Sequence, residues 1–213
     1  MRRLPPMAIS RRTFTLTASL LAATTLGLGV AHANPVVGEP APDFTATTAT
    51  GETVSLSDFA GQTVMLEWTN HGCPYVVRHY GGNMQAQQDA AAEAGVVWIQ
   101  VISSAPGEQG YVSAEEALAL NEERGASNVA HIFMDPEGVI GRAYDARTTP
   151  HMYVIDGEGT LRYNGGIDDQ PRPRAGDPDP IPYAQLALNA VLAGEEVETP
   201  ETQPYGCNVK YAG

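Results

Sequence analysis

The sequence has few cysteines, few basic residues and no long apolar run. Only two cysteines occur among its 213 residues, which allows one disulfide bond, a redox pair or part of a metal site. Lys and Arg number 12 against 25 Asp and Glu, and this balance argues against binding to nucleic-acid phosphates or to anionic membrane surfaces. No G-x-G-x-x-G motif follows a predicted strand, so nothing indicates a nicotinamide or flavin site.

Residues 1–33 have the pattern of an export signal and are not expected to belong to the folded domain. The letters SRRTF at residues 10–14 form a twin-arginine signature, which is typical of bacterial Tat export. A membrane anchor is the alternative, but the apolar stretch 16–30 contains Thr, Ser and Gly and is shorter than the roughly 20 apolar residues that a span needs. Ala31-His32-Ala33 fits a cleavage site. We therefore expect a periplasmic protein whose single domain is residues 34–213.

Short apolar runs in residues 34–213 alternate with segments that have helical features, which predicts an α/β domain. A helix from Pro74 to about Ala94, interrupted at Gly81-Gly82, separates the runs 64–68 and 96–102. This long crossover favours parallel pairing of the two strands. Asn83 is expected to cap the second half of that helix. Further strands are expected at 44–48, 53–56, 131–134, 152–155 and 160–163, further helices at 113–124, 139–144 and 183–192, an exposed loop at 168–182, and an irregular tail at 195–213.

The segment WTNHGCPYV at residues 68–76 carries the clearest chemical signal. Cys73 lies at the junction of a predicted strand and a helix, where backbone N–H groups and the helix dipole favour the thiolate. Pro74 suits the first helical position because its missing N–H would be unpaired there. His71 is either a positive neighbour that favours the thiolate or an exposed loop residue. The alternative for Cys73 is a small buried hydrophobic side chain.

Several features resemble the thioredoxin superfamily, and most closely its peroxiredoxin-like branch, which is grouped with the alkyl hydroperoxide reductase and thiol-specific antioxidant family. They are the Cys73 junction, Thr148-Thr149-Pro150 before a strand, a hairpin at 156–159, Ala41-Pro42-Asp43-Phe44 and the late Cys207. The resemblance implies a thioredoxin-like fold, with a central mixed sheet flanked by helices and an N-terminal hairpin extension. It also implies a cis Pro150 that packs against Cys73, with a partner's extended backbone docking around it.

Two departures from these families limit the chemistry that the resemblance implies. Thioredoxins carry a second cysteine where this chain has Val76, so a local dithiol is absent. Peroxiredoxins carry a proline, a threonine and an arginine where this chain has Leu66, Asn70 and Pro150. The threonine and arginine hold the peroxide oxygens in that family. We therefore expect weak peroxide reduction here, although any exposed thiolate reacts slowly with peroxide.

The leading hypothesis is an exported thiol–disulfide oxidoreductase that needs no cofactor. Cys73 is the expected nucleophile, and Cys207 is either its resolving partner or the other half of a permanent disulfide staple. Gly206 would allow the tail to approach closely. Thr149 and Arg147 are expected near the thiolate, although a surface salt bridge is the alternative for Arg147. The partners would be protein or small-molecule thiols and disulfides, with an external reductant.

Two other functions stay open at this stage. Sco-type copper chaperones have the same fold, and Cys73 and Cys207 with His71, His79 or His151 could offer copper soft ligands. His79 is otherwise expected to be structural. The third possibility is a non-catalytic module that is stapled by the Cys73–Cys207 disulfide.

Overall fold

A computed structural model describes Met1 and residues 34–213, so the predicted export signal lies outside the described residues. None of the helices among these residues is long and apolar enough to cross a membrane. The elements are β1 Thr45–Thr47, β2 Thr53–Ser55, the 3-10 helix η1 Leu56–Phe59, β3 Val64–Trp68, α1 Pro74–His79, α2 Asn83–Glu93, β4 Val97–Ile102, α3 Ala114–Glu123, β5 His131–Met134, α4 Val139–Ala143, β6 Thr148–Thr149, β7 His151–Ile155, β8 Leu161–Gly165, α5 Tyr183–Ala193 and β9 Cys207–Asn208.

The central sheet has five strands in the order β5-β4-β3-β7-β8. β3, β4 and β5 run parallel, whereas β7 is antiparallel to both β3 and β8. The parallel pairing predicted from the long crossover is therefore confirmed, with Trp68 opposite Val101 of β4. Because β3 lies in the middle, the turn that follows it is centrally placed at one end of the sheet.

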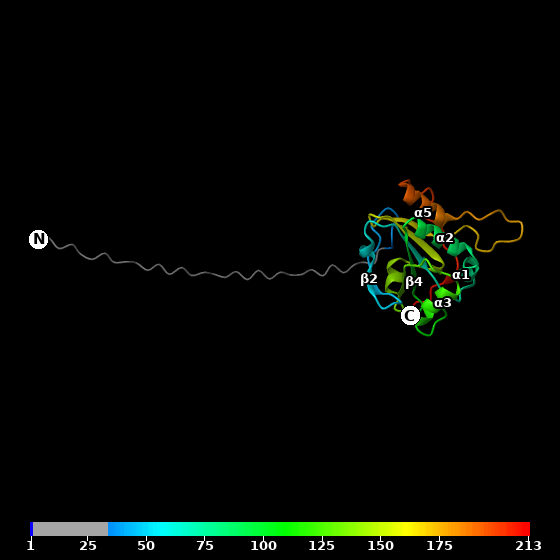
Figure 1. Ribbon diagram of the computed structural model, residues 1–213, viewed down its shortest axis with the longest axis horizontal. Coiled ribbons are helices and arrows are strands. Elements are labelled where there is room, and N and C mark those ends of the chain that lie inside the picture. The colour runs from blue at the N-terminus through cyan, green and yellow to red at the C-terminus, as the bar shows by residue number, and fades with distance from the viewer. Residues whose placement is uncertain (2–33) are drawn as a thin grey trace. The chain divides into compact units, whose positions relative to one another are not determined.

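Alternating side chains of β3 face two separate layers. Met65 belongs to a core cluster with residues of α1, α2 and α5, whereas Leu66 belongs to a second cluster with residues of η1 and α4. The antiparallel hairpin β1–β2 packs on the second side. Figure 1 shows this arrangement, with α1, α2 and α5 grouped together and the hairpin away from them. Burial of large side chains on both faces, including Trp68 and Trp98, provides the main stabilisation of the fold.

Both outer strands of the central sheet have further backbone neighbours. On β8, Asn164 donates its N–H to Pro200 of the tail at 3.0 Å, and Thr202 donates to Asn164 at 3.2 Å. On β5, Ala49 of the hairpin donates to Ile132 at 2.7 Å. A separate two-stranded ladder joins β6 and β9. The segment 195–213 is thus tied to the domain at several points.

Two local predictions need correction. Asn83 is the first residue of α2 rather than its cap, because Gly82 takes the capping position with a φ of 127° that favours glycine. The Asn83 amide instead lies 3.0 Å from Nδ1 of His79. The tail is not wholly irregular, because Cys207–Asn208 forms β9. The predicted capping box of Ser113 and Glu116 at the start of α3 is confirmed.

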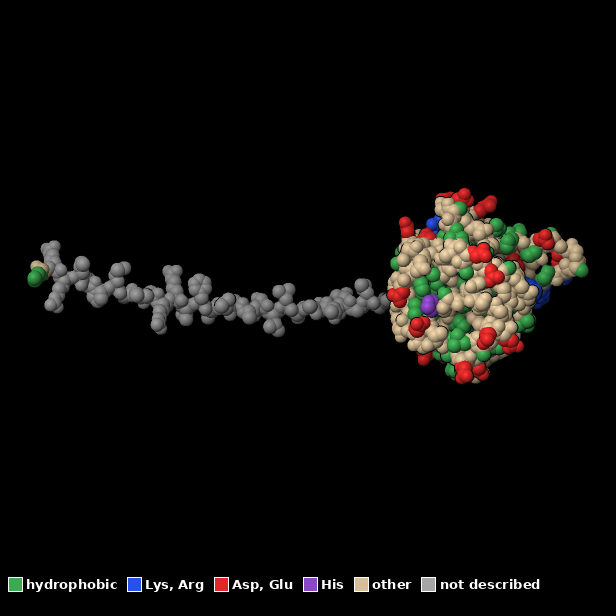
Figure 2. Space-filling view, in the orientation of Figure 1, with side chains coloured by type: hydrophobic (Ala, Val, Ile, Leu, Met, Phe, Trp, Pro, Cys, Tyr) green, Lys and Arg blue, Asp and Glu red, His purple; other side chains and the backbone are tan. Residues whose placement is uncertain are grey.

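Figure 2 shows acidic side chains spread over one face of the molecule, with few basic side chains among them. This distribution agrees with the excess of 25 Asp and Glu over 12 Lys and Arg. In this view the basic side chains lie near the rim, mostly beside the protruding loop, and the acidic ones are spread over the rest of the face.

Candidate active site

The turn between β3 and α1 is held by hydrogen bonds from its own residues and from a neighbouring loop. The Cys73 N–H donates to the Asn70 carbonyl at 2.9 Å, and the Gly72 N–H donates to Asn70 Oδ1 at 3.0 Å. Asn70 Nδ2 donates to Gln109 Oε1 at 2.9 Å, and Gln109 Nε2 donates back to Asn70 Oδ1 at 3.2 Å. Asn70, at the peroxiredoxin threonine position, therefore fixes the turn that carries Cys73.

Cys73 is the N-cap residue of α1, and Pro74 is the first residue of that helix, as predicted. The Cys73 side chain is 0% exposed. Its thiol donates a hydrogen bond to the Thr149 carbonyl at 3.1 Å, and the Thr149–Pro150 peptide bond is cis. The predicted contact between the cysteine and the cis-proline segment is thus present, but the expected solvent access to Cys73 is not.

Cys207 lies beside the same segment. In the antiparallel ladder of β6 and β9, Cys207 is directly opposite Thr149. Gly206, just before it, has a φ of +146°, and a Cβ atom added there would overlap the Thr149 carbonyl. Only glycine combines this backbone conformation with so close an approach. The predicted role of Gly206 therefore fits the structure.

The two thiols differ in pKa, because each is influenced by the other and by its own burial. Burial raises the pKa of Cys73, but the neighbouring Cys207 thiol, the Val76 N–H and the Thr149 side chain together outweigh it, so the net pKa is lowered. Burial and the neighbouring Cys73 raise the pKa of Cys207 to about 11. Both cysteines are free thiols in this structure. Cys73 is therefore the group that ionises first, and the nearby Cys207 thiol favours its thiolate.

His71 does not supply a positive charge to this pair. Its Nε2 lies 3.3 Å from Oδ1 of Asn121 in α3. Burial and the nearby Arg124 guanidinium lower the pKa of His71 to about 4, against the raising effect of the Asn121 hydrogen bond. At neutral pH His71 is uncharged and half-buried, so neither predicted role, a cationic neighbour or an exposed loop residue, describes it.

The Arg147 side chain has no hydrogen bond to either thiol among the contacts of residues 34–213. It is 55% exposed and forms an ion pair with Asp145, with 3.8 Å between Nε and Oδ2. The alternative prediction for Arg147, a surface salt bridge, therefore describes its side chain. Its backbone has a different role, because the Arg147 carbonyl accepts a hydrogen bond from the Val209 N–H at 3.0 Å and so extends the contact between the tail and β6.

The edge of β6 is occupied by the chain itself. β9 pairs with Thr148 and Thr149, the residues that lead into cis-Pro150. A partner polypeptide was expected to dock its extended backbone around Pro150. It cannot form that ladder while the tail is in place, because the hydrogen-bonding edge is already used.

A family model described as AhpC/TSA family matches residues 37–164. The chain belongs to the AhpC/TSA family. This membership confirms the predicted peroxiredoxin-like branch of the thioredoxin superfamily and identifies the protein as an oxidoreductase of the redoxin type. The matched residues include Cys73 and Pro150, whereas Cys207 lies in the tail beyond them.

Solved structures confirm the fold of this AhpC/TSA protein. A hypothetical protein from Sinorhizobium meliloti 1021 has a TM-score of 0.73 at 23% identity, covering 85% of this chain and 97% of its own. An uncharacterized conserved protein from Geobacillus kaustophilus has a TM-score of 0.73 at 26% identity, covering 83% and 93%. A putative protein disulfide isomerase from Bacteroides thetaiotaomicron has a TM-score of 0.53 at 22% identity, covering 75% and 91%. No curated protein sequence matches the chain.

The AhpC/TSA protein also buries a carboxylate that the sequence analysis did not single out. Glu67 of β3 is 0% exposed. It accepts hydrogen bonds from Tyr80 at 2.9 Å, Trp98 at 3.0 Å and Gln100 at 3.3 Å. Asn121 then connects Gln100 to His71 of the active-site turn. A single acidic residue inside the apolar run 64–68 was the available signal for this network.

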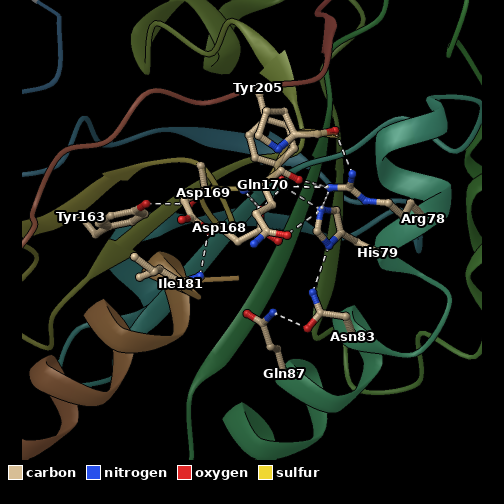
Figure 3. A network of polar contacts seen from close by, with 12 residues as sticks. Arg78, His79, Asn83, Gln87, Tyr163, Asp168, Asp169, Gln170, Ile181 and Tyr205 are labelled. Atoms are coloured by element: carbon tan, nitrogen blue, oxygen red, sulfur yellow. Dashed lines mark hydrogen bonds and ion pairs between the residues drawn. The ribbon is translucent and has the colours of Figure 1, made fainter. Parts of the chain in front are cut away.

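A second polar cluster was also missed. It joins Arg78 and His79 of α1 to Asp168 and to Tyr205, two residues before Cys207 (Figure 3). The expectation that His79 is structural agrees with its burial, since it is 4% exposed. In the sequence, the indication of this cluster was Tyr205, which stands immediately before Gly206 and Cys207.

The copper alternative needs Cys73, Cys207 and a histidine to converge. The candidate histidines have other partners: His71 hydrogen-bonds to Asn121, His79 to Asn83 and Tyr205, and His151 to Asn164. Within residues 34–213, no group of three or more His, Cys, Asp or Glu side chains is arranged to hold a metal ion. In this structure the two thiols and a histidine therefore do not converge, and copper binding stays a prediction.

Proposed function

We propose that this protein is an exported thiol–disulfide oxidoreductase in which Cys73 and Cys207 alternate between a dithiol and a disulfide. The observation that carries the proposal is that both cysteines meet the same residue beside cis-Pro150: the Cys73 thiol donates to the Thr149 carbonyl at 3.1 Å, and Cys207 is opposite Thr149 in the β6–β9 ladder. The lowered pKa of Cys73, and the pKa of Cys207 that burial and the neighbouring Cys73 raise to about 11, agree with this placement. Export rests on the twin-arginine pattern of the first 33 residues.

Oxidation begins at the Cys73 thiolate, and because Cys73 is 0% exposed the substrate reaches it only when the tail that carries Cys207 moves aside. With a disulfide substrate, the thiolate attacks one sulfur and forms a mixed disulfide, and the other sulfur leaves as a thiolate. With a peroxide, Cys73 becomes a sulfenic acid and an alcohol or water leaves. In either case the Cys207 thiolate then attacks the Cys73 sulfur. The Cys73–Cys207 disulfide forms, and the substrate thiolate or hydroxide leaves and takes up a proton.

Reduction begins at the other sulfur. Cys207 is partly exposed, whereas Cys73 is 0% exposed, so an external thiolate reaches Cys207 first. It forms a mixed disulfide there and expels Cys73, the thiol of lower pKa and hence the better leaving group. A second external thiolate then attacks the sulfur of the first external thiol in this mixed disulfide, and Cys207 leaves as a thiolate. The cycle oxidises two external thiols to one disulfide for each internal disulfide that is reduced.

The test is equilibration of the purified protein in glutathione redox buffers, followed by acid quenching, alkylation under denaturing conditions and peptide mass mapping. We expect a Cys73–Cys207 disulfide whose fraction changes reversibly with the buffer potential. A Cys207→Ser variant should form a mixed disulfide with glutathione at Cys73 and no internal bond. Two free thiols in every buffer would overturn the proposal. An internal disulfide that excess dithiothreitol cannot reduce in the folded protein would identify a permanent staple instead.

A further inference from the structure

Tyr205 fixes the tail to the active-site helix. Its hydroxyl donates a hydrogen bond to Asp168 and accepts one from Arg78 Nη2 at 3.0 Å. The same hydroxyl lies 3.0 Å from Nε2 of His79. Arg78 and His79 are the last two residues of α1, the helix whose N-cap is Cys73.

The partners of Tyr205 are themselves held in place. Arg78 also donates to the carbonyls of Gln170 at 3.0 Å and Pro171 at 2.8 Å. Asp168 is 7% exposed and lies 4.0 Å from His79. Figure 3 shows three segments of the chain meeting here: α1, the start of the loop 168–182, and the tail. A cluster in which each member is fixed by others presents a preorganised acceptor and donor to the Tyr205 hydroxyl.

We propose that Tyr205 is a positioning residue that holds Cys207 against Cys73. This inference rests on the proposed function, because the pair being positioned is the proposed redox pair. The Tyr205 hydroxyl touches neither sulfur among the contacts of residues 34–213, and it acts through the backbone of Gly206.

The tail needs such an anchor because its own secondary structure is short. β9 has two residues and makes a ladder with the two residues of β6. Between the end of α5 and β9, residues 194–206 form no helix or strand of more than one residue. The backbone bonds of Pro200 and Thr202 to Asn164 fix the tail farther from the cysteine, so Tyr205 is the anchoring side chain that most closely precedes Cys207, and without it the effective concentration of Cys207 at Cys73 would fall. Hydrogen bonds to charged partners such as Asp168 and Arg78 are the stronger ones.

The tail has a second anchor beyond Cys207, which brackets the cysteine. The Tyr211 hydroxyl donates to the Ala146 carbonyl at 2.6 Å, and the Arg142 guanidinium lies 4.8 Å from the Tyr211 ring centre. This second anchor keeps the tail near β6 when the first is weakened. A change at Tyr205 should therefore alter the geometry of the thiol pair without releasing the whole tail.

The test compares Tyr205→Phe with the wild type. This variant removes the hydroxyl and keeps the ring, which packs 5.8 Å from the Tyr75 ring. The first readout is the equilibrium constant of the Cys73–Cys207 disulfide against glutathione. We expect it to fall by about tenfold or more, the range set by the loss of hydrogen bonds to charged groups. The second variant is Asp168→Asn, for which we expect a smaller decrease of the same equilibrium constant. It provides the test if Tyr205→Phe does not fold.

The matched control is Tyr144→Phe. The Tyr144 hydroxyl is also buried and donates to the Pro42 carbonyl at 2.8 Å, in the core cluster on the opposite face of the sheet from α1. This control should keep the equilibrium constant within about twofold, because distant sites rarely couple. If the equilibrium constant of Tyr144→Phe falls as far as that of Tyr205→Phe, the positioning role of Tyr205 is overturned.

The second readout separates this inference from the proposed function. It follows the thiolate absorbance of the reduced protein at about 240 nm against pH, and needs no redox cycling. In Tyr205→Phe we expect the pKa of Cys73 to rise, because the Cys207 thiol that favours the thiolate is no longer held beside it. If the wild type forms no internal disulfide, the proposed function fails, while a raised pKa in Tyr205→Phe still supports the positioning role. An unchanged equilibrium constant with an unchanged pH profile overturns that role.

Discussion

At the scale of single residues, Glu67 is an unusual member of the core. A carboxylate is costly to bury unless it is hydrogen-bonded, and here buried donors from the end of α1 and from β4 converge on it. Arg124 lies 3.6 Å from the ring centre of Tyr80, one of these donors. Burial and the Glu67 charge raise the pKa of Tyr80 well above its ordinary value, so its hydroxyl stays protonated and continues to donate.

We expect Glu67→Ala to lower the free energy of unfolding by about 3 kcal/mol or more, because it leaves several buried donors without an acceptor. Glu67→Gln should cost less, since it keeps one acceptor oxygen. Urea denaturation measures both values. Glu122→Gln, on the exposed side of α3, is the control and should stay within about 0.5 kcal/mol of the wild type. Equal stability of Glu67→Ala and the wild type would contradict this account of the network.

Residues with local signals could be predicted, and those with distant partners could not. The positions of Cys73 and Pro74 at the start of a helix follow from their neighbours in the sequence, whereas the cis Pro150 beside Cys73 was implied by the resemblance to the thioredoxin superfamily. Asp168 and Tyr205 meet only because the loop 168–182 and the tail both return to α1. The charge state of His71 was equally out of reach, because it depends on Asn121 and on burial in the folded chain.

At the scale of elements, strands with clear apolar runs were predicted well. The run 64–68 matches β3 residue for residue, and the crossover to 96–102 gave the correct parallel pairing. β6 and β9 were missed because two-residue strands have no detectable period, and their pairing joins distant parts of the sequence. The capping position of α2 was misplaced because Gly82 and Asn83 are both acceptable cap residues by sequence alone.

The β6–β9 pair depends on glycine at position 206. We expect Gly206→Ala to move β9 away from Thr149, because the added Cβ would overlap the Thr149 carbonyl and the residue would keep a strained φ of +146°. The rate of internal disulfide formation after oxidation should fall by about tenfold or more, as expected for lost proximity. Stopped-flow mixing with diamide, followed by alkylation and mass analysis, measures this rate.

Gly176→Ala is the matched control for this substitution. Gly176 has a φ of +91°, but nothing lies within 4 Å of an added Cβ. It carries the backbone strain without the overlap, and its rate of disulfide formation should equal that of the wild type. A slow rate in Gly176→Ala, or a normal rate in Gly206→Ala, would show that the close approach at Thr149 does not control the reaction.

At the scale of the whole molecule, several histidines are buried in neutral form. Burial lowers the pKa of His151 to about 3 and that of His79 to about 4, with Arg147 and Arg78 acting in the same direction. Their ordinary value is about 6.5. The unfolded chain therefore binds a proton more tightly than the folded one. Stability is complete above pH 6.5 and falls as the pH drops toward these lowered values.

We expect the free energy of unfolding to decrease between pH 6.5 and pH 4, with each buried histidine contributing up to about 1.4 kcal/mol per pH unit. His151→Gln should make this decrease smaller, because its side chain does not take up a proton. Urea denaturation at pH 7, 6 and 5 of both proteins gives the two slopes. Identical slopes would show that His151 does not contribute to acid unfolding.

The tail also bears on association between copies of the molecule. Residues 200–202 use the backbone groups of β8, and β9 uses those of β6. A strand with free N–H and C=O groups is a template for another chain, and proteins commonly protect such strands. Detachment of this one segment would bare two templates together. The tail, which carries Cys207, therefore also protects the edges of β6 and β8 from pairing with a strand of another copy.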